Sequence, residues 1–214
     1  MPELKLKLKY FEKKNLIEVG VDEAGRGCLA GPVYAAAVIL PDKFPDDKYK
    51  QIKDSKKLSE KKREELFEYI TRNVKDYSIA QLSAQEIDKI NILQASFNAM
   101  HNAIDGLAII PDHLLIDGNR FKPYQSIEKD DFIEHTCIKS GDNKYIAIAA
   151  ASILAKVSRD RYMKLLCKKD QTLDTKYGWI KNKAYATKQH RDGIQRHGLT
   201  EYHRKTFGIC KNYI

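Results

Sequence analysis

Four acidic residues lie at the boundaries of predicted secondary-structure elements. Asp22 and Glu23 follow one apolar run, and Asp117 closes another. Asp142 comes directly before a strongly apolar segment. Ligands of open α/β sheets bind beyond the carboxyl ends of strands, and carboxylates without a matching His or Cys set suit Mg²⁺ or Mn²⁺. We therefore expect these acids to share a divalent-metal site.

Each acid also has a simpler interpretation on its own. Asp22 and Glu23 would be solvated acids at a strand end, Asp117 a turn former, and Asp142 a helix N-cap. Neighbouring strand residues point to opposite faces, so we expect the backbone to turn there and bring Asp22 and Glu23 to one cation. Four crowded carboxylates repel one another unless a divalent ion neutralises them.

Two further groups of residues could contact a ligand. Gly25 and Gly27 flank Arg26 and would let the backbone approach a ligand closely, although a tight turn alone would also explain them. Ser152 and Lys156, followed by Arg159 or Asp160, lie on one face of the apolar helix. That polar face would meet a phosphate backbone; an internal ion pair between Lys156 and Asp160 is the alternative.

The C-terminal part of the chain interleaves aromatic and basic residues. Such a pattern is typical of surfaces that stack bases and contact phosphates, and a solvated basic face is the alternative. The aromatic residues are Tyr177, Trp179, Tyr185 and Tyr202, and the basic ones are Lys176, Lys181, Lys183, Lys188, Arg191, Arg196, Arg204 and Lys205.

The elements that must position these residues can be read from hydrophobic periodicity and turn signals. Strands are predicted at 16–21, 33–40, 77–82, 111–117 and 132–138, and the first two form a hairpin-like pair around an unusual loop. Helices are predicted after Ser59 as N-cap, from 83 to 107 with a break near Asn91, and from 144 to 168. Segment 41–53 is loop-like, and one or two short helices follow Asp170. These elements indicate an α/β fold, a mixed five-stranded sheet flanked by helices with a small C-terminal helical extension.

Length and composition narrow the class of protein. The chain has 214 residues, which suits a single domain, residues 1–214, with a core up to about residue 170 and a basic, aromatic extension over 171–214. The net charge is +9, which favours polyanionic partners such as nucleic acid. Cys28, Cys137, Cys167 and Cys210 form no C-x-x-C pair, so they are predicted to be core or incidental thiols in a reducing compartment.

No membrane segment or signal peptide is expected. The longest apolar stretches, 33–40 and 146–155, are far shorter than the ~18 residues that a membrane span needs. The start of the chain alternates Lys with Leu and has neither an apolar core nor a cleavage site. We therefore expect a cytoplasmic protein, and a monomer.

The chain resembles bacterial-type ribonuclease HII in a series of ordered blocks over about residues 16–207. The matching blocks are 22–27, 29–33, 54–58, 116–119, 141–142 with 149–157 and 159–160, 182–187 with His190, and 197–198 through 203–207. The resemblance implies an RNase H-like fold and an endonuclease that cleaves the RNA strand of RNA–DNA hybrids and cuts 5′ of single ribonucleotides in duplex DNA.

The resemblance also assigns roles to residues. Asp22, Glu23, Asp117 and Asp142 match the catalytic carboxylates, expected to hold two Mg²⁺ or Mn²⁺ ions ~4 Å apart and to leave 5′-phosphate and 3′-OH ends. Gly25, Arg26, Gly27 and Tyr185 match the group that senses the ribose 2′-OH. Lys56, Asn119, Ser152 and Lys156 lie in matching blocks and are expected to bind substrate. RNA–DNA hybrids and DNA duplexes containing ribonucleotides are therefore the expected partners.

The sequence departs from the family pattern at Cys28, where Pro or a small residue is usual, and at Ala184 and Ala186, where glycines usually flank the tyrosine. Three alternatives remain at this point. A hybrid-binding module without catalysis would not need four acids, and a related polynucleotidyl transferase would not need the Gly-Arg-Gly loop. Ribonuclease HIII resembles Gly-Lys-Gly at this loop and carries an extra N-terminal domain, for which about 15 residues leave no room.

Overall fold

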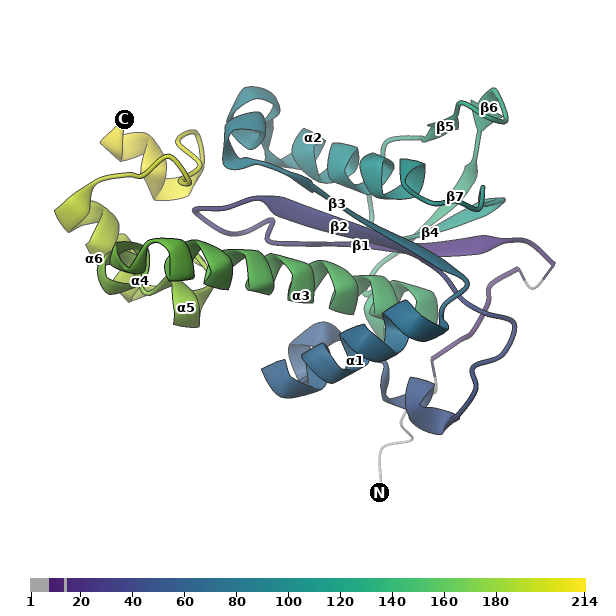
Figure 1. Cartoon of the computed structure of the whole chain (residues 1–214). Coiled ribbons are helices and arrows are strands. Elements are labelled where there is room, and N and C mark those ends of the chain that lie inside the picture. The colour runs from purple at the N-terminus through teal and green to yellow at the C-terminus, as the bar shows by residue number, and fades with distance from the viewer. Residues whose placement is uncertain (1–7, 14) are drawn as a thin grey trace, which may run out of the picture.

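A mixed five-stranded sheet forms the centre of the molecule (Figure 1). The computed structural model describes residues 8–13 and 15–214. The strand order is β3-β2-β1-β4-β7; β1, β2 and β3 pair antiparallel, and β4 and β7 run parallel to β1. The strands are β1 (Glu18–Ala24), β2 (Val33–Ile39), β3 (Asp76–Leu82), β4 (His113–Asp117) and β7 (Glu134–Ile138). The predicted mixed sheet and its initial hairpin are confirmed.

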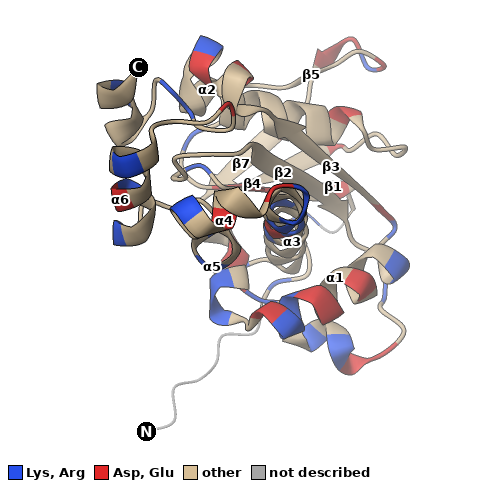
Figure 2. Ribbon diagram, turned by 60° about the vertical axis from the view of Figure 1, so that its left-hand side comes forward, with Lys and Arg blue, Asp and Glu red and all other residues tan. Residues whose placement is uncertain are grey.

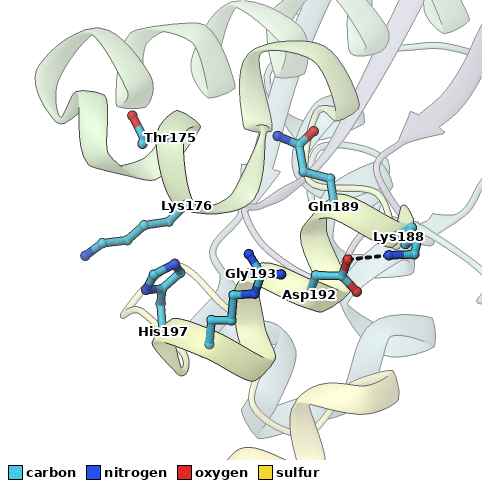
Figure 3. A pocket seen from close by; sticks show the side chains of 8 residues that line it. Thr175, Lys176, Lys188, Gln189, Asp192, Gly193 and His197 are labelled. Atoms are coloured by element: carbon cyan, nitrogen blue, oxygen red, sulfur yellow. Dashed lines mark hydrogen bonds and ion pairs between the residues drawn. The ribbon is translucent and has the colours of Figure 1, made fainter.

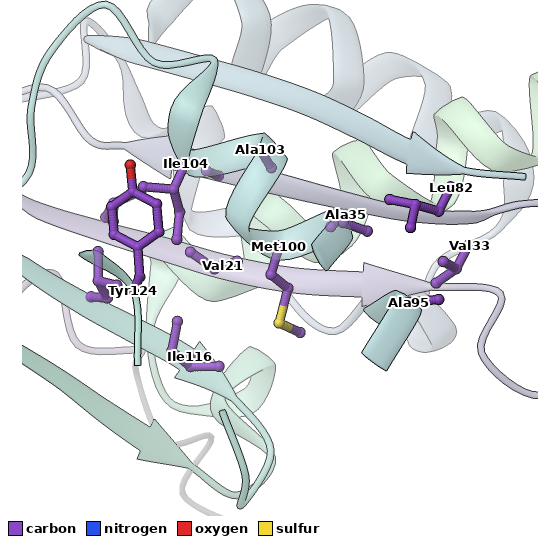
Figure 4. Close-up of a cluster of buried hydrophobic side chains, with 14 of the residues drawn as sticks. Val21, Val33, Ala35, Leu82, Ala95, Met100, Ala103, Ile104, Ile116 and Tyr124 are labelled. Carbon is purple, nitrogen blue, oxygen red and sulfur yellow. The ribbon is translucent and has the colours of Figure 1, made fainter. Parts of the chain in front are cut away.

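Helices cover both faces of this sheet. Helix α2 (Ala84–Asp105) covers one face, and α3 (Ile146–Lys169) covers the other with α1 (Glu60–Asn73) packed outside it (Figure 1). Alternate residues of each strand therefore enter two separate apolar layers. Val21, Ala35 and Ile116 pack beneath α2 (Figure 4), whereas Ala36 and Val38 pack against α3.

The helix boundaries follow their predicted signals. Ser59 accepts a hydrogen bond from the Lys62 amide and caps α1. Ser83 and Glu86 form a reciprocal capping box at the start of α2. Asn91 interrupts α2 with φ 66°, which confirms the predicted break.

Several segments differ from the prediction. The last sheet strand begins at Glu134 rather than at residue 132, because Phe132 belongs to β6 (Asp131–Phe132), which pairs with β5 (Gln125–Ser126) in a separate two-stranded sheet. Segment 41–53, expected to be a loop, contains the 3-10 helix η1 (Asp47–Gln51), and η2 (Ser55–Lys57) and η3 (Gly141–Asn143) were not anticipated. Short elements of this kind carry too few residues to show a periodicity.

The C-terminal extension contains more helical elements than expected. It comprises α4 (Gln171–Tyr177), α5 (Trp179–Asn182), α6 (Lys188–His197) and the 3-10 helix η4 (Gly208–Tyr213). Their apolar side chains pack on Met163 and Leu166 of α3 and on Leu29 and Ala30, which follow β1. The extension therefore supports the loop between β1 and β2 as well as the end of α3.

Two remaining expectations concern cysteines and membranes. All four cysteines are free; Cys28, Cys167 and Cys210 are buried and Cys137 is half-buried, as expected for core thiols. Within residues 8–13 and 15–214, the helices are too short or too polar to cross a membrane. The expectation of no signal peptide rests on the alternation of Lys and Leu at the start of the chain. This segment lies largely in residues 1–7, outside the described residues.

The contact between β1 and α3 predicts a strict requirement for glycine at position 20. A Cβ atom there would lie 2.2 Å from the backbone carbonyl carbon of Ala147, which cannot move without shifting α3. We expect Gly20→Ala to lower the free energy of unfolding by about 3 kcal/mol, measured by denaturant titration. Gly27→Ala is the control, since no described atom beyond its chain neighbours lies within 4 Å of a Cβ there. An equal loss in both variants would contradict this account of the contact.

Candidate active site

The register of β1 and β4 brings two acids together. Val21 pairs with Ile116 as the last pair of this parallel ladder, and the next residue in each strand is an acid, Asp22 in β1 and Asp117 in β4. Asp117 still pairs with Ile138 of β7. The two carboxylates therefore lie side by side where the β1–β4 ladder ends, as expected from the parallel arrangement.

The backbone does not turn at Asp22 and Glu23, contrary to our expectation. Strand β1 continues to Ala24, and both acids remain paired with Ala36 and Ala35 of β2. The two side chains therefore leave opposite faces of the strand. Asp22 is buried on the side of α3, next to Ser152, whereas Glu23 is half-buried on the other side. Both carboxylates come near Asp117 on the part of β1 that extends beyond its pairing with β4, and the backbone does not turn there.

Asp142 reaches the same place through η3. The Gly141 amide donates a hydrogen bond of 2.6 Å to Oδ1 of Asp117, which ties the start of η3 to the end of β4. Asp142, the next residue, is buried, and its Oδ1 accepts from the Asn143 side chain at 2.8 Å. The N-cap position of α3 belongs to Tyr145, so the N-cap interpretation of Asp142 is wrong.

Burial and mutual repulsion perturb these carboxyl groups. Burial raises the pKa of Asp22 well above its ordinary value, and the charges of Glu23 and Asp117 raise it further. Burial also raises the pKa of Glu23 and of Asp142, and the charge of Asp117 adds to both shifts. The four acids therefore form one repelling group.

The donor set fits a divalent cation. It consists of carboxylate oxygens, which Mg²⁺ and Mn²⁺ prefer, and its repulsion would be relieved by positive charge. Among the described residues, no group of three or more Asp, Glu, His or Cys side chains is arranged so that it could hold a metal ion as it stands. The carboxylates thus line an open strand edge rather than a closed coordination cage.

A fifth acid, Asp54, was not singled out by sequence reasoning. Asp54 is buried; its Oδ1 accepts from the Lys56 amide, and its charge helps to raise the pKa of Asp142. The Asn143 side chain lies between the two acids, 2.8 Å from Asp142 and 3.4 Å from Asp54. The only signal for Asp54 was its place in the block 54–58.

Lys56 lies beside the acids, and Asn119 follows Asp117 closely. The positive charge of Lys56 offsets part of the rise in the pKa of both Glu23 and Asp142, so its exposed side chain faces the carboxylates. Asn119 is exposed two residues beyond the end of β4. Both predicted substrate-binding residues are therefore open to a ligand at this edge.

The loop after β1 presents Arg26 and Gly27 to solvent and buries Gly25. The Arg26 guanidinium lies 3.9 Å from Glu23 and offsets part of the rise that burial causes in the pKa of that carboxyl. Gly25 has φ +92°, and a Cβ there would lie 2.0 Å from Nε of Arg159. Gly25 is therefore required by packing against Arg159, whereas Gly27 leaves an open approach to the backbone.

Two buried arginines hold this loop from behind. Arg159 donates to the carbonyls of Ala30, Pro32 and Lys183. Arg204 donates to the carbonyls of Gly25, Arg26 and Gly31. Both side chains are fully buried, so the expectation that Arg204 belongs to a surface that contacts phosphates is wrong. They compensate carbonyl groups that would otherwise be buried without donors.

Ser152 and Lys156 have internal partners. Ser152 is buried, with its Oγ 3.0 Å from Oγ of Ser55, and it lies next to Asp22. Nζ of Lys156 lies 2.6 Å from Asp160, so the ion pair considered as an alternative is present. The same ammonium lies 5.6 Å from the centre of the Tyr185 ring.

Tyr185 stands next to the glycine loop. Its backbone forms an isolated β-bridge with Cys28, and its ring is partly exposed at 41%. Ala184, just before it, is buried and has φ 64°, a conformation that favours glycine. The structure therefore brings Tyr185 to the loop despite the departure from the family pattern.

The C-terminal aromatic and basic residues divide into two groups. Tyr177 and Trp179 are buried and Lys183 is almost fully covered, so these three do not form the expected nucleic-acid surface. Exposed basic residues remain along α4 and α6, where the ribbon is blue in Figure 2. Lys176, Lys188 and Arg196 line a groove of about 420 Å³ between these helices (Figure 3).

Known proteins share this sequence over nearly its whole length. The family model described as Ribonuclease HII matches residues 19–210. The chain belongs to the ribonuclease HII family. It is therefore a ribonuclease H, an endonuclease that degrades RNA in RNA–DNA hybrids. Ribonuclease HII of Parabacteroides distasonis is 55% identical over 202 residues, 94% of each chain, and that of Bacteroides thetaiotaomicron is 53% identical over 199 residues, 93% of each chain.

Solved structures share the fold. Ribonuclease H2 from Pyrococcus horikoshii has a TM-score of 0.71 at 24% identity, covering 92% of this chain and 96% of that one. The ribonuclease HII in a complex with PCNA from Archaeoglobus fulgidus has a TM-score of 0.70 at 26% identity, covering 90% and 96%. A Bst-RNase HIII in complex with Mn²⁺ has a TM-score of 0.66 at 18% identity and is covered over 68% of its length. The expected RNase H-like fold is confirmed.

Burial of Asp22 and repulsion by its neighbouring carboxylates predict that Asp22→Asn stabilises the metal-free protein at pH 7. The raised pKa of Asp22 means that its ionisation opposes folding above that pKa, and this penalty disappears as the pH falls toward 3.8. We expect a gain of about 1 kcal/mol, or roughly 2–4 °C in Tm, and less response to Mg²⁺ than in the unsubstituted protein.

Asp112→Asn is the matched control at the opposite end of β4. Asp112 accepts hydrogen bonds from the Ile17 amide and from Lys129, which lower its pKa. The same substitution there should therefore reduce Tm. A loss of stability in both variants would show that repulsion at Asp22 is not the dominant effect.

Proposed function

We propose that this ribonuclease H cuts the RNA strand of hybrids and also cuts 5′ of single ribonucleotides in duplex DNA, leaving 5′-phosphate and 3′-OH ends. Asp22, Glu23, Asp117 and Asp142 are its catalytic carboxylates. The observation that carries the proposal is the β1–β4 register, which sets Asp22 beside Asp117 next to the exposed part of the glycine loop.

The four acids would hold two Mg²⁺ or Mn²⁺ ions when substrate is bound. Such ions activate water and stabilise the departing 3′-oxygen. The protein's own contribution is to keep the carboxylates in place. Asp22 accepts a hydrogen bond from the Glu23 amide, Asp117 from the Gly141 amide, and Asp142 from the Asn143 side chain. No protein side chain needs to act as a covalent nucleophile.

Arg26, Gly27 and Tyr185 would recognise the ribose at an RNA-to-DNA junction. Gly27 leaves its backbone open to a 2′-OH, the group that distinguishes RNA from DNA. Tyr185 offers a partly exposed ring that is linked to the loop through Cys28. Gly25 supports this arrangement from the buried side. Lys56 and Asn119 would contact the backbone near the acids, and Lys156 would act through the Tyr185 ring.

The basic groove between α4 and α6 would hold phosphates farther along the duplex. Among the described residues, no carboxylate oxygen lies within 4.0 Å of the charged nitrogens of Lys176 or Arg196, whereas Lys188 pairs with Asp192 at 2.7 Å. Exposed cations bind phosphates mainly by releasing counterions, so this contribution is independent of sequence and sensitive to salt.

Loss of the acids should abolish cleavage while binding remains. We expect Asp22→Asn and Asp142→Asn to cut a DNA duplex with one ribonucleotide at least ~10²-fold more slowly in Mg²⁺ or Mn²⁺. The measurement is single-turnover cleavage with analysis of product ends, together with Kd for the uncut duplex. EDTA should stop the unsubstituted enzyme.

Asp76→Asn, in β3 away from the acid cluster, serves as the carboxylate control, and its rate should stay near that of the unsubstituted enzyme. Near-normal cleavage by Asp22→Asn would refute the assignment of the acids. Binding without any cleavage by the unsubstituted protein would favour a hybrid-binding module, and cutting independent of the ribonucleotide would favour a polynucleotidyl transferase.

The groove should contribute to the salt dependence of binding. Replacing Lys176 and Arg196 with Ala should flatten the slope of log K against log [salt] by about one unit per lost phosphate contact. Lys75 and Arg72, exposed near the opposite end of β2, provide a control pair with the same loss of charge. Equal slopes for the two double variants would show that the groove is only a solvated basic surface.

A further inference from the structure

The loop that carries Tyr185 adopts an unfavourable backbone conformation that its neighbours hold in place. Lys183 and Ala184 are consecutive non-glycine residues with φ 50° and 64°, a left-handed conformation that brings Cβ close to the following carbonyl oxygen. Every carbonyl from Lys183 to Ala186 accepts a hydrogen bond. The donors are Arg159 to Lys183, the Leu29 amide to Ala184, the Thr187 amide and the His190 ring to Tyr185, and Arg191 to Ala186.

A buried pair of histidines lies directly behind this loop. His190 and His203 are 0% and 1% exposed, and their Nε2 atoms are 3.1 Å apart. Nδ1 of His190 is 3.1 Å from the carbonyl oxygen of Tyr185. Trp179 Nε1 donates to Nε2 of His190 at 3.0 Å. Neither histidine takes part in the proposed chemistry at the acids.

The hydrogen bonds allow only one arrangement of protons. The Thr200 amide, which can only donate, lies 2.9 Å from Nδ1 of His203, so that nitrogen accepts and the proton of a neutral His203 is on Nε2. His203 then donates to Nε2 of His190, which also accepts from Trp179. The proton of His190 must therefore be on Nδ1, where it is donated to the Tyr185 carbonyl.

The surroundings favour neutral rings. Burial lowers the pKa of His190 to about 4 and that of His203 to about 3, and for His203 the nearby His190 adds to the effect. The titratable ring facing the pair from α4 is Tyr177, 5.8 Å and 5.0 Å from the two imidazoles. The Arg204 guanidinium is directed to the carbonyls of the glycine loop. A second proton on His190 would point at the N–H groups of His203 and Trp179, and a second proton on His203 would point at the Thr200 amide.

We propose that His190 is a positioning residue for Tyr185, and that His203 fixes the His190 tautomer that makes this possible. The proposal rests on the proposed role of Tyr185 at the RNA-to-DNA junction. The Thr200 amide fixes the tautomer of His203, and His203 fixes the tautomer of His190. His190 then holds the Tyr185 carbonyl next to residues 183 and 184, which have a left-handed backbone conformation. A specificity determinant is thereby placed on a buried scaffold formed by the C-terminal extension.

Two substitutions of His190 separate positioning from packing. His190→Asn keeps a donor near the position of Nδ1 but leaves Trp179 and His203 without their acceptor. His190→Gln keeps an acceptor near the position of Nε2 but loses the bond to Tyr185. We expect His190→Asn to be the less stable variant and to retain junction preference, and His190→Gln to be the more stable variant and to lose it.

The readout is the ratio of kcat/KM for a single embedded ribonucleotide to that for a long hybrid. We expect Tyr185→Ala and His190→Gln each to lower this ratio about fivefold or more, the range of a lost stacking contact. Adding His190→Gln to Tyr185→Ala should lower it no further. Gln195→Ala, exposed on the same helix, is the control and should leave the ratio unchanged.

Equal loss on both substrates in His190→Gln, or an additive loss in the double variant, would overturn the positioning role. An unchanged ratio in Tyr185→Ala would overturn the role of Tyr185 and this inference with it. Failure of the unsubstituted enzyme to cut at a single ribonucleotide would instead refute the proposed function. Imidazole ¹⁵N NMR of the unsubstituted protein at pH 7 tests the two histidine tautomers independently of activity. We expect Nδ1–H on His190 and Nε2–H on His203. The opposite tautomers, or a charged ring, would overturn the proposal.

Discussion

Repulsion among carboxylates at the end of the β1–β4 ladder is the constraint on which the rest of the site depends. Asp22 is buried there beside Asp117, although burial and the neighbouring charges raise its pKa and its ionisation opposes folding. The fold tolerates this cost because the surrounding core is large and because β1 continues to pair with β2 past the acids. Arg26 and Lys56 offset part of the charge without closing the site. The result is an open edge that a divalent cation would stabilise.

The second requirement is a loop that stays in place beside that edge. Arg159 and Arg204 hold this loop in place with six hydrogen bonds to backbone carbonyls, and five of these carbonyls belong to residues 25–32. Since one arginine comes from α3 and the other follows α6, they connect the loop to both the core and the C-terminal extension. The histidine pair extends the same principle to Tyr185. Buried polar groups thus hold exposed groups in position.

Sequence patterns predicted the sheet, the capped helices and the break at Asn91, because periodicity and caps are local signals. They also predicted that the four acids come together at one edge of the sheet, since the acids lie at strand ends and in a run of matching blocks. The burial of Arg159, Arg204 and Trp179 could not be predicted, because the residues that they contact lie elsewhere in the chain. For the two arginines, charge alone suggests a surface exposed to solvent. Asp54 was missed for the same reason. The turn expected at Asp22 was wrong because the sequence predicted the hairpin but not the length of its pairing, and β1 stays paired with β2 through Ala24.

The most direct test of this account is a ¹³C NMR titration of the carboxyl groups in metal-free protein, with and without saturating Mg²⁺. The account predicts that Asp22 and Asp142 take up protons above their ordinary pKa and that Mg²⁺ lowers both values. Ordinary titration of both residues, unchanged by Mg²⁺, would contradict the claim that repelling carboxylates at the β1–β4 edge form the metal-binding centre.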